Sequence, residues 1–181
     1  MNAFLQELQQ QAQDAMQHSG VLAQELEQLR RIGVTAPHIE LTADPALTLP
    51  MAEESQIDSA FLSAGIPLKG RYMAISLRNW EGFEEKAPLF RALAEHVYRT
   101  PAVTPVFVSV EKTHDPHAAA LAAEGLSCPH YFINGADRIQ TIIGILSRME
   151  AVVSMRLHSL IFAAGQGTPL VGIVYDPKVS S

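Results

Sequence analysis

Apolar residues recur along most of the chain in short runs of β-strand length, separated by amphipathic stretches of helix length. Strands alternating with helices in this way are typical of βαβ units, so the pattern predicts an α/β fold: a three-layer, Rossmann-like parallel sheet with helices on both faces. The predicted strands are His38–Thr42, Tyr72–Leu77, Val106–Val110, Tyr131–Ile133, Ala151–Met155 and Leu170–Val174. The predicted helices are Glu53–Gly65, Pro88–Tyr98 with its proline near the start, His117–Glu124, Asp137–Met149 with Asp137 at or near the N-cap, and Leu157–Ala164.

The first part of the chain has a different pattern. From Ala3 to Ile32 the sequence is rich in Gln and Glu, with apolar residues near helical spacing. The segment His18–Gly20 is predicted to divide this stretch into two helices, and Gly33 is predicted to end the second one. We therefore expect an N-terminal helical segment over residues 1–33 and a Rossmann-like domain over residues 34–181.

Composition narrows the class of protein. The 181 residues suffice for one ordinary domain, and the net charge of −6 argues against nucleic acid as the partner, because phosphate binding needs a basic surface. The single cysteine, Cys128, cannot form an internal disulfide, and no metal-ligand spacing of Cys and His occurs. Neither a signal peptide nor a membrane span is evident. These features predict a cytoplasmic protein.

Polar residues that follow buried strands are the best candidates for function, since ligands of open α/β sheets bind beyond the carboxyl ends of the strands. Arg156 and His158 stand where the apolar strand ending at Met155 runs into an apolar helix. Together with the free N–H groups of the helix, Arg156 suits an anion such as a carboxylate or phosphate. Two structural alternatives stay open: Arg156 pairs with an Asp or Glu of the framework, and His158 is an ordinary core histidine.

Three other strand ends carry polar groups. Arg78 can grip an anion and Trp80 can stack on a sugar or base, although Arg78 on the surface with Trp80 packed against a helix explains them about as well. After the next strand, His114 and Asp115 are expected to lie in a solvated loop more readily than to act as a pair. Lys178 follows the last strand. It either reaches the same end of the sheet as His158 or faces solvent.

Three segments resemble one known family. The stretch VVSMRLHSLIFAAGQGTPLVGIVYDPKV is similar to the signature of the polysaccharide pyruvyl transferases, and ISLRNW and LTADPAL resemble other segments of that family in the same order. The similarity spans about Ala23 to Val179. It implies the architecture of the B-type glycosyltransferases, with two Rossmann-like domains facing a cleft. It also implies transfer of the pyruvyl group of phosphoenolpyruvate to two hydroxyls of a sugar, giving a pyruvate ketal on a cell-wall polysaccharide or a glycan precursor.

The resemblance also implies roles for individual residues. The Arg-x-His pair of the family falls on Arg156 and His158, and its lysine after Asp-Pro falls on Lys178. His158 would then be the general acid and base, and Arg156 would act beside it by stabilising the departing phosphate together with Lys178. Arg78, Trp80 and Ser159 are further candidates for substrate binding, on the chemistry of their side chains and not on the resemblance. No metal or cofactor is expected, with phosphoenolpyruvate as co-substrate.

The chain departs from the family pattern at both ends. Family members carry a whole N-terminal Rossmann-like domain, and where they have an Arg-Asp pair this chain reads Val21–Glu25, without the arginine. The family also continues past the position of Ser181. We therefore expect this chain to be the C-terminal domain portion of a two-domain enzyme. We expect its acceptor to be a sugar, lipid-linked or free, and the enzyme to be cytoplasmic, either in solution or peripheral to a membrane.

Two other functions remain open at this stage. A nucleotide-sugar glycosyltransferase shares the architecture and would need a carboxylate for the ribose and a pocket for the base. A non-catalytic module would instead assemble with itself through the apolar stripe of Leu22, Leu26 and Leu29 on the N-terminal helices.

Overall fold

The computed structural model describes residues 27–34 and 44–174, which belong to two separate units. In the first, residues 27–31 are helical, and Gly33 adopts a left-handed φ of +88°. Its N–H donates to the carbonyl of Arg30, and Val34 donates to that of Leu29, so the helix ends at Gly33 as predicted. The predicted helical residues before Glu27 and the predicted strand His38–Thr42 lie outside the described residues.

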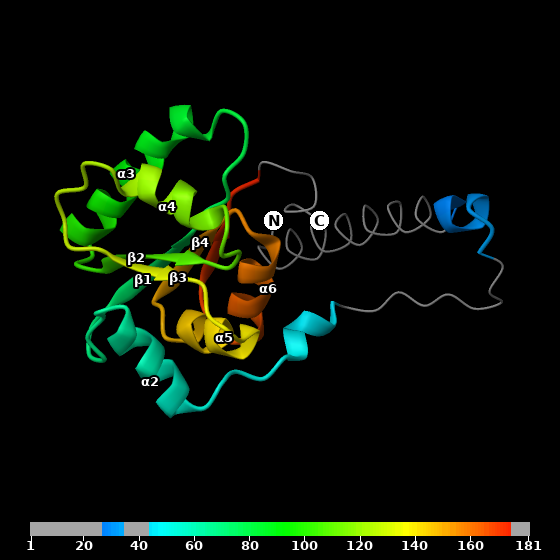
Figure 1. The fold of residues 1–181 in the computed structure, drawn as a ribbon, viewed down its shortest axis with the longest axis horizontal. Coiled ribbons are helices and arrows are strands. Elements are labelled where there is room, and N and C mark those ends of the chain that lie inside the picture. Colours follow the sequence, from blue (N-terminus) through cyan, green and yellow to red (C-terminus); the bar gives the residue numbers. More distant parts are fainter. Residues whose placement is uncertain (1–26, 35–43, 175–181) are drawn as a thin grey trace, which may run out of the picture. The chain divides into compact units, whose positions relative to one another are not determined.

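The second unit is built on a five-stranded sheet in which every neighbouring pair is parallel. Figure 1 shows the strands side by side between two groups of helices. Their spatial order is β3-β2-β1-β4-β5, so the chain reverses its direction of travel across the sheet between β1 and β4. The strands are β1 Tyr72–Ser76, β2 Thr104–Ser109, β3 Tyr131–Asn134, β4 Ala151–Ser154 and β5 Leu170–Gly172.

Helices cover both faces of this sheet, as predicted. α3 and α4 pack on one face, and α2, α5 and α6 on the other (Figure 1). None of the helices in the described parts of the chain combines the length and the apolar character that crossing a bilayer requires. The helices are the short 3₁₀ turn η1 Pro45–Thr48, α2 Glu54–Ser63, α3 Phe83–Arg99, α4 Asp115–Ala123, α5 Ile139–Ser147 and α6 Leu157–Gly165.

Alternation along the strands divides the buried residues into two cores. Ala74 and Val106 face the α2, α5 and α6 side, whereas Ile75 and Phe107 face the α3 and α4 side. Because both faces are covered, the central strands need apolar side chains at nearly every position, and this is why they appear in the sequence as continuous apolar runs.

The predicted start of one helix is wrong, and the starts of two others are displaced by two residues; one of these is α4, which begins at Asp115 and not at His117. α3 begins at Phe83, so Pro88 lies inside the helix and not near its start. Phe83 is fully buried and stacks on Phe90, and this anchoring outweighs the single backbone hydrogen bond that the proline removes. α5 begins at Ile139 with Arg138 as its N-cap, so Asp137 lies next to the N-cap, as predicted, but outside the helix. Asp137 pairs with Lys112 at 2.8 Å, which holds the pKa of its carboxyl below the usual value.

The close approach of α6 to η1 yields a first prediction. A Cβ at Gly165 would lie 2.7 Å from the backbone carbonyl oxygen of Leu47. Alanine favours a helix over glycine by about 1 kcal/mol, but a clash with backbone forces η1 to move, at a cost of about 1–3 kcal/mol. We expect Gly165→Ala to lower the thermal unfolding midpoint despite the better helix propensity.

Gln166→Ala is the matched control, because it changes the neighbouring residue and adds no atom toward η1. Its unfolding midpoint should stay close to that of the wild type. A Gly165→Ala protein more stable than the wild type would show that η1 is not held against α6.

Candidate active site

The reversal between β1 and β4 creates the site. Ser76 and Ser154 are paired in register at the carboxyl ends of these two strands, and the N–H of Met155 donates to the carbonyl of Ser76 at 3.0 Å. The chain leaves β1 toward Arg78 and β4 toward Arg156. Two arginines therefore follow neighbouring strands at the position where open α/β sheets bind their ligands.

A cavity of about 510 Å³ lies at this edge. That volume is within the range of small-molecule sites. Arg78, Arg156 and His158 supply its charged and titratable groups, so three of the predicted site residues share one cavity. The remaining wall is mostly apolar: Ala46, Leu49, Val110, Ile139, Leu157 and Phe162.

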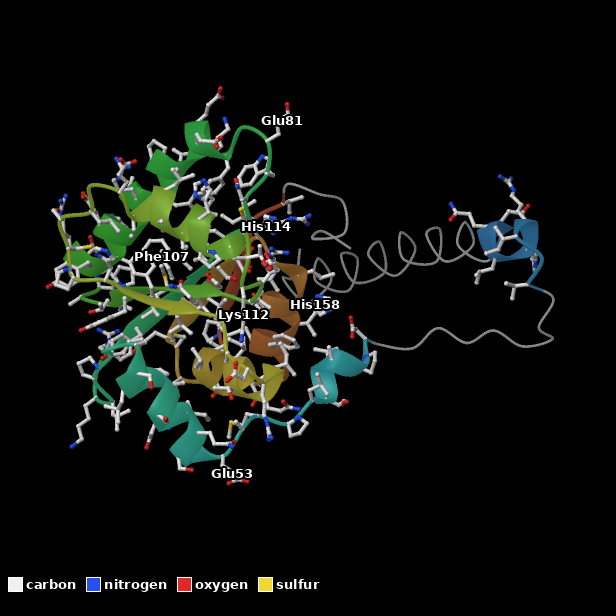
Figure 2. All side chains as sticks on the ribbon, in the orientation of Figure 1. Glu53, Glu81, Phe107, Lys112, His114 and His158 are labelled. Carbon is white, nitrogen blue, oxygen red and sulfur yellow. The ribbon has the colours of Figure 1, made fainter. Side chains whose placement is uncertain are left out.

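His158 lies in the first turn of α6, and Figure 2 shows its side chain on that helix. The side chain is exposed, with its ring 6.0 Å from the ring of Phe162. His158 is therefore not a buried core histidine, and the alternative that placed it in the core is wrong. An exposed imidazole at the mouth of a cavity can exchange protons with both solvent and a bound ligand.

Arg156 is held by a buried carboxylate. Its Nε lies 3.0 Å from Oδ1 and 3.1 Å from Oδ2 of Asp115, and its Nη2 also donates to Oδ1. Asp115 is only 1% exposed, while the side chain of Arg156 is 22% exposed. One edge of the guanidinium is thus occupied inside the protein, and the residue still lines the cavity.

Asp115 is the residue that sequence reasoning missed. It lies buried at the start of α4, so the expectation of a solvated loop is wrong for it, although it holds for the exposed His114. The imidazole of His114 contacts Glu111 and not Asp115. Two features could have identified Asp115: it follows a strong central strand, and it directly precedes a proline at the start of an Ala-rich helix.

The remaining predicted residues lie elsewhere. Ser159 is fully buried, with its Oγ 3.0 Å from that of Ser76. Trp80 packs edge-on against Phe83 and lines a separate apolar pocket of about 380 Å³ beside α3. Lys178 lies outside the described residues. The structure therefore brings together Arg78, Arg156 and His158, and does not bring Ser159 or Trp80 to their cavity.

The turn between β2 and α4 is stabilised by Glu111. Its carboxylate accepts the backbone N–H groups of Thr113 at 2.6 Å and His114 at 2.7 Å. These hydrogen bonds lower the pKa of Glu111 from 4.5 to about 2, and the bond from His114 has the largest effect. The same turn carries Val110 and Asp115 at its two ends, so Glu111 helps to shape one side of the cavity.

The lowered pKa predicts a pH-dependent contribution to stability. Because the folded state holds Glu111 ionised more strongly than the unfolded state does, the stabilisation is complete above about pH 4.5 and is lost as the pH falls toward 2. We expect Glu111→Gln to unfold at a lower temperature than the wild type at pH 6, and this gap to close between pH 4.5 and 2. Thermal unfolding followed across that range, with Glu81→Gln as a charge-matched variant on another loop, measures it. A gap that keeps its size at pH 2 would contradict this account of the turn.

Comparison with known proteins places the chain in a family. The family model described as polysaccharide pyruvyl transferase matches residues 24–177. The chain belongs to the polysaccharide pyruvyl transferase family. The match includes η1, all five strands of the sheet and every residue that lines the cavity, so the family resemblance and the site concern the same part of the chain. No curated protein matches the chain.

A solved structure confirms the fold of this pyruvyl transferase family member. A glycosyl transferase family 9 protein from Veillonella parvula is 15% identical, with a TM-score of 0.54 over 80% of this chain and 40% of that one. UDP-GlcNAc 2-epimerase from Neisseria meningitidis, solved with UDP-GlcNAc bound, is 16% identical, with a TM-score of 0.46 over 70% of this chain and 33% of the epimerase. The chain thus spans less than half the length of either structure.

Within the described residues, no three His, Cys, Asp or Glu side chains are grouped so that they could hold a metal ion. The chemistry available at the cavity is that of two guanidinium groups, an imidazole and the first turn of a helix. The N-cap residue of α6, Arg156, makes no side-chain capping bond, so the N–H groups of that turn are not occupied by a cap. Such a set is suited to binding an anion and moving a proton beside it.

Proposed function

We propose that this chain is the part of a polysaccharide pyruvyl transferase that binds phosphoenolpyruvate and transfers the proton. The enzyme would move the pyruvyl group to two hydroxyls of a sugar in a cell-wall polysaccharide or glycan precursor and release inorganic phosphate. The observation that carries the proposal is the convergence of Arg78, Arg156 and His158 on one cavity in a chain of this family. A second domain, consistent with the fraction of the solved structures that this chain covers, would supply most of the acceptor site.

The anionic groups of phosphoenolpyruvate match the cations of the cavity. The substrate carries a carboxylate and a phosphate. The cavity is lined by Arg78 and Arg156 and by the first turn of α6, with Leu157 and His158. Guanidinium groups bind both kinds of anion through paired hydrogen bonds. Lys178 would add a third cation as the phosphate leaves.

The reaction needs one proton to be delivered to carbon. A sugar hydroxyl adds through its oxygen to C2 of the enol and loses its own proton, while C3 gains a proton and becomes a methyl group. A second hydroxyl of the sugar then displaces the phosphate at C2, and its proton leaves with the phosphate or to solvent. His158 is suited to deliver the proton to C3 and to take up the proton that the first hydroxyl loses, because its imidazole can both donate and accept a proton and lies exposed at the cavity.

No step of this reaction uses a metal or cofactor. The reaction would take place in the cytoplasm, or at the membrane surface where the acceptor is lipid-linked. Trp80 and Ser159 have no direct contact with substrate in this scheme, because one lines another pocket and the other is buried.

Ligand binding tests the proposal. Isothermal titration calorimetry of the full chain should show binding of phosphoenolpyruvate and its weakening in Arg78→Met, with Arg71→Met as a control because Arg71 pairs with Glu150 away from the cavity. A nucleotide sugar should bind more weakly than phosphoenolpyruvate. Binding of the nucleotide sugar but not of phosphoenolpyruvate would refute the proposal in favour of a glycosyltransferase.

A further inference from the structure

A buried carboxylate behind the cavity contacts two of the residues that line it, Arg156 and Val110. Asp115 does not line the cavity, yet both of its oxygens contact the guanidinium of Arg156, which does. The two residues lie 41 positions apart, on α4 and at the start of α6. The contact therefore joins the ends of β2 and β4 across the end of β1.

Asp115 is itself rigidly held. Its Oδ2 accepts the backbone N–H groups of Val110 at 3.3 Å and Glu111 at 3.0 Å, in addition to the contact with Arg156. All of these partners are donors, so the site requires a group that can only accept, which is an ionised carboxylate. The side chain is almost completely buried and cannot rotate away into solvent.

The contact determines which donors Arg156 can offer to a ligand. A guanidinium has five N–H donors in a rigid plane. Asp115 takes the Nε and Nη2 edge, so the two hydrogens on Nη1 and the second one on Nη2 are the donors left for the cavity. Because the guanidinium plane is rigid, holding one of its edges also sets the direction of its remaining N–H donors.

We propose that Asp115 is a positioning residue that aims the remaining donors of Arg156 at the phosphate or carboxylate group of the bound substrate. The inference rests on the proposed function. It assigns to Asp115 a role in ligand affinity, whereas a purely structural ion pair would affect only stability.

The charge of Asp115 and its position would have opposite effects on the affinity for an anion, so substitutions can distinguish them. Removing the negative charge of Asp115 makes the charge around the cavity more positive, so electrostatics alone would tighten the binding of an anion. Asp115→Glu keeps the charge but moves the carboxylate by one methylene. If Asp115 acts by position, both Asp115→Glu and Asp115→Asn should weaken the binding of phosphoenolpyruvate by about 10-fold or more.

A double-mutant cycle identifies the residue through which Asp115 acts. Lysine offers no planar edge to be held, so in an Arg156→Lys background the change Asp115→Glu should weaken binding by less than about 2-fold. Asp58→Glu is the matched control, since Asp58 forms an aspartate–arginine pair with Arg148 outside the cavity, at 2.7 Å. It should leave the dissociation constant unchanged.

The experiment is calorimetry of these full-length variants with phosphoenolpyruvate and, separately, with inorganic phosphate, on samples shown to be folded by circular dichroism. Should Asp115→Glu fail to fold, Asp115→Asn carries the test. Wild-type affinity in a folded Asp115 variant, or equal losses with and without the Arg156→Lys change, would overturn the positioning role and leave the proposed function standing. Binding of phosphate with the expected dependence on Asp115, but none of phosphoenolpyruvate, would refute the proposed function alone. A wild-type chain that binds neither anion would refute both.

Discussion

Replacing Arg156 by methionine should destabilise the protein by about 3 kcal/mol, because it leaves the carboxylate of Asp115 buried without its cation. Asp115 is 1% exposed, so solvent cannot take the place of the guanidinium. The two backbone N–H groups that Asp115 also accepts keep the loss below that of a fully isolated charge. In thermal unfolding, the midpoint should fall by about 10 °C.

Arg148→Met is the matched comparison. Arg148 pairs with the carboxylates of Glu54 and Asp58. These two side chains are 70% and 40% exposed, so water can solvate them once the arginine is gone. This variant should lose about 1 kcal/mol or less. Adding Asp115→Asn to Arg156→Met should recover part of the stability, since the uncompensated charge is then removed. Equal losses in the two arginine variants would show that the Asp115 pair is not a special contact.

Under the proposed function, replacing His158 by glutamine should reduce the rate of pyruvyl transfer by about 10²- to 10⁴-fold, the contribution expected of a general acid and base. The side chain is exposed, so the unfolding free energy should stay within about 0.5 kcal/mol of the wild type. The measurement is acceptor-dependent release of inorganic phosphate from phosphoenolpyruvate, with thermal unfolding of the same preparations.

His117→Gln is the control for this effect. His117 is likewise exposed, but it lies on α4 and does not line the cavity. Its transfer rate should remain within about 2-fold of the wild type. Wild-type turnover by a folded His158→Gln protein would remove His158 from the catalytic role and leave the cavity as a binding site only.

The parallel sheet was predictable because a strand that is covered on both faces must be apolar throughout. Tyr72–Ser76 and Thr104–Ser109 stand out for this reason, and the rule that ligands bind at carboxyl ends then directs attention to Arg78, Arg156 and His158. Helix starts were less predictable. The burial of Phe83 extends α3 past a proline, and this tertiary contact has no local signal in the sequence.

The Asp115–Arg156 pair could not be derived from the sequence. A structural carboxylate was one of the two alternatives for Arg156, but several acidic residues near strand ends were equally eligible, and only the spatial order of β2, β1 and β4 selects Asp115. Trp80 is the opposite case, a residue that the sequence predicts at the site but that lies elsewhere. It follows the same strand as Arg78, but the short loop after β1 turns it toward Phe83 and α3, away from the cavity.

The central claim is that phosphoenolpyruvate binds at the carboxyl ends of β1 and β4, and nuclear magnetic resonance of the isotope-labelled chain tests it most directly. On titration with phosphoenolpyruvate, the backbone amide signals of Leu157 and His158 and the side-chain signals of Arg78 and Arg156 should shift together. Signals from the pocket beside α3, such as the indole N–H of Trp80, should stay in place. Shifts confined to residues outside the cavity, or none at millimolar phosphoenolpyruvate, would contradict the account.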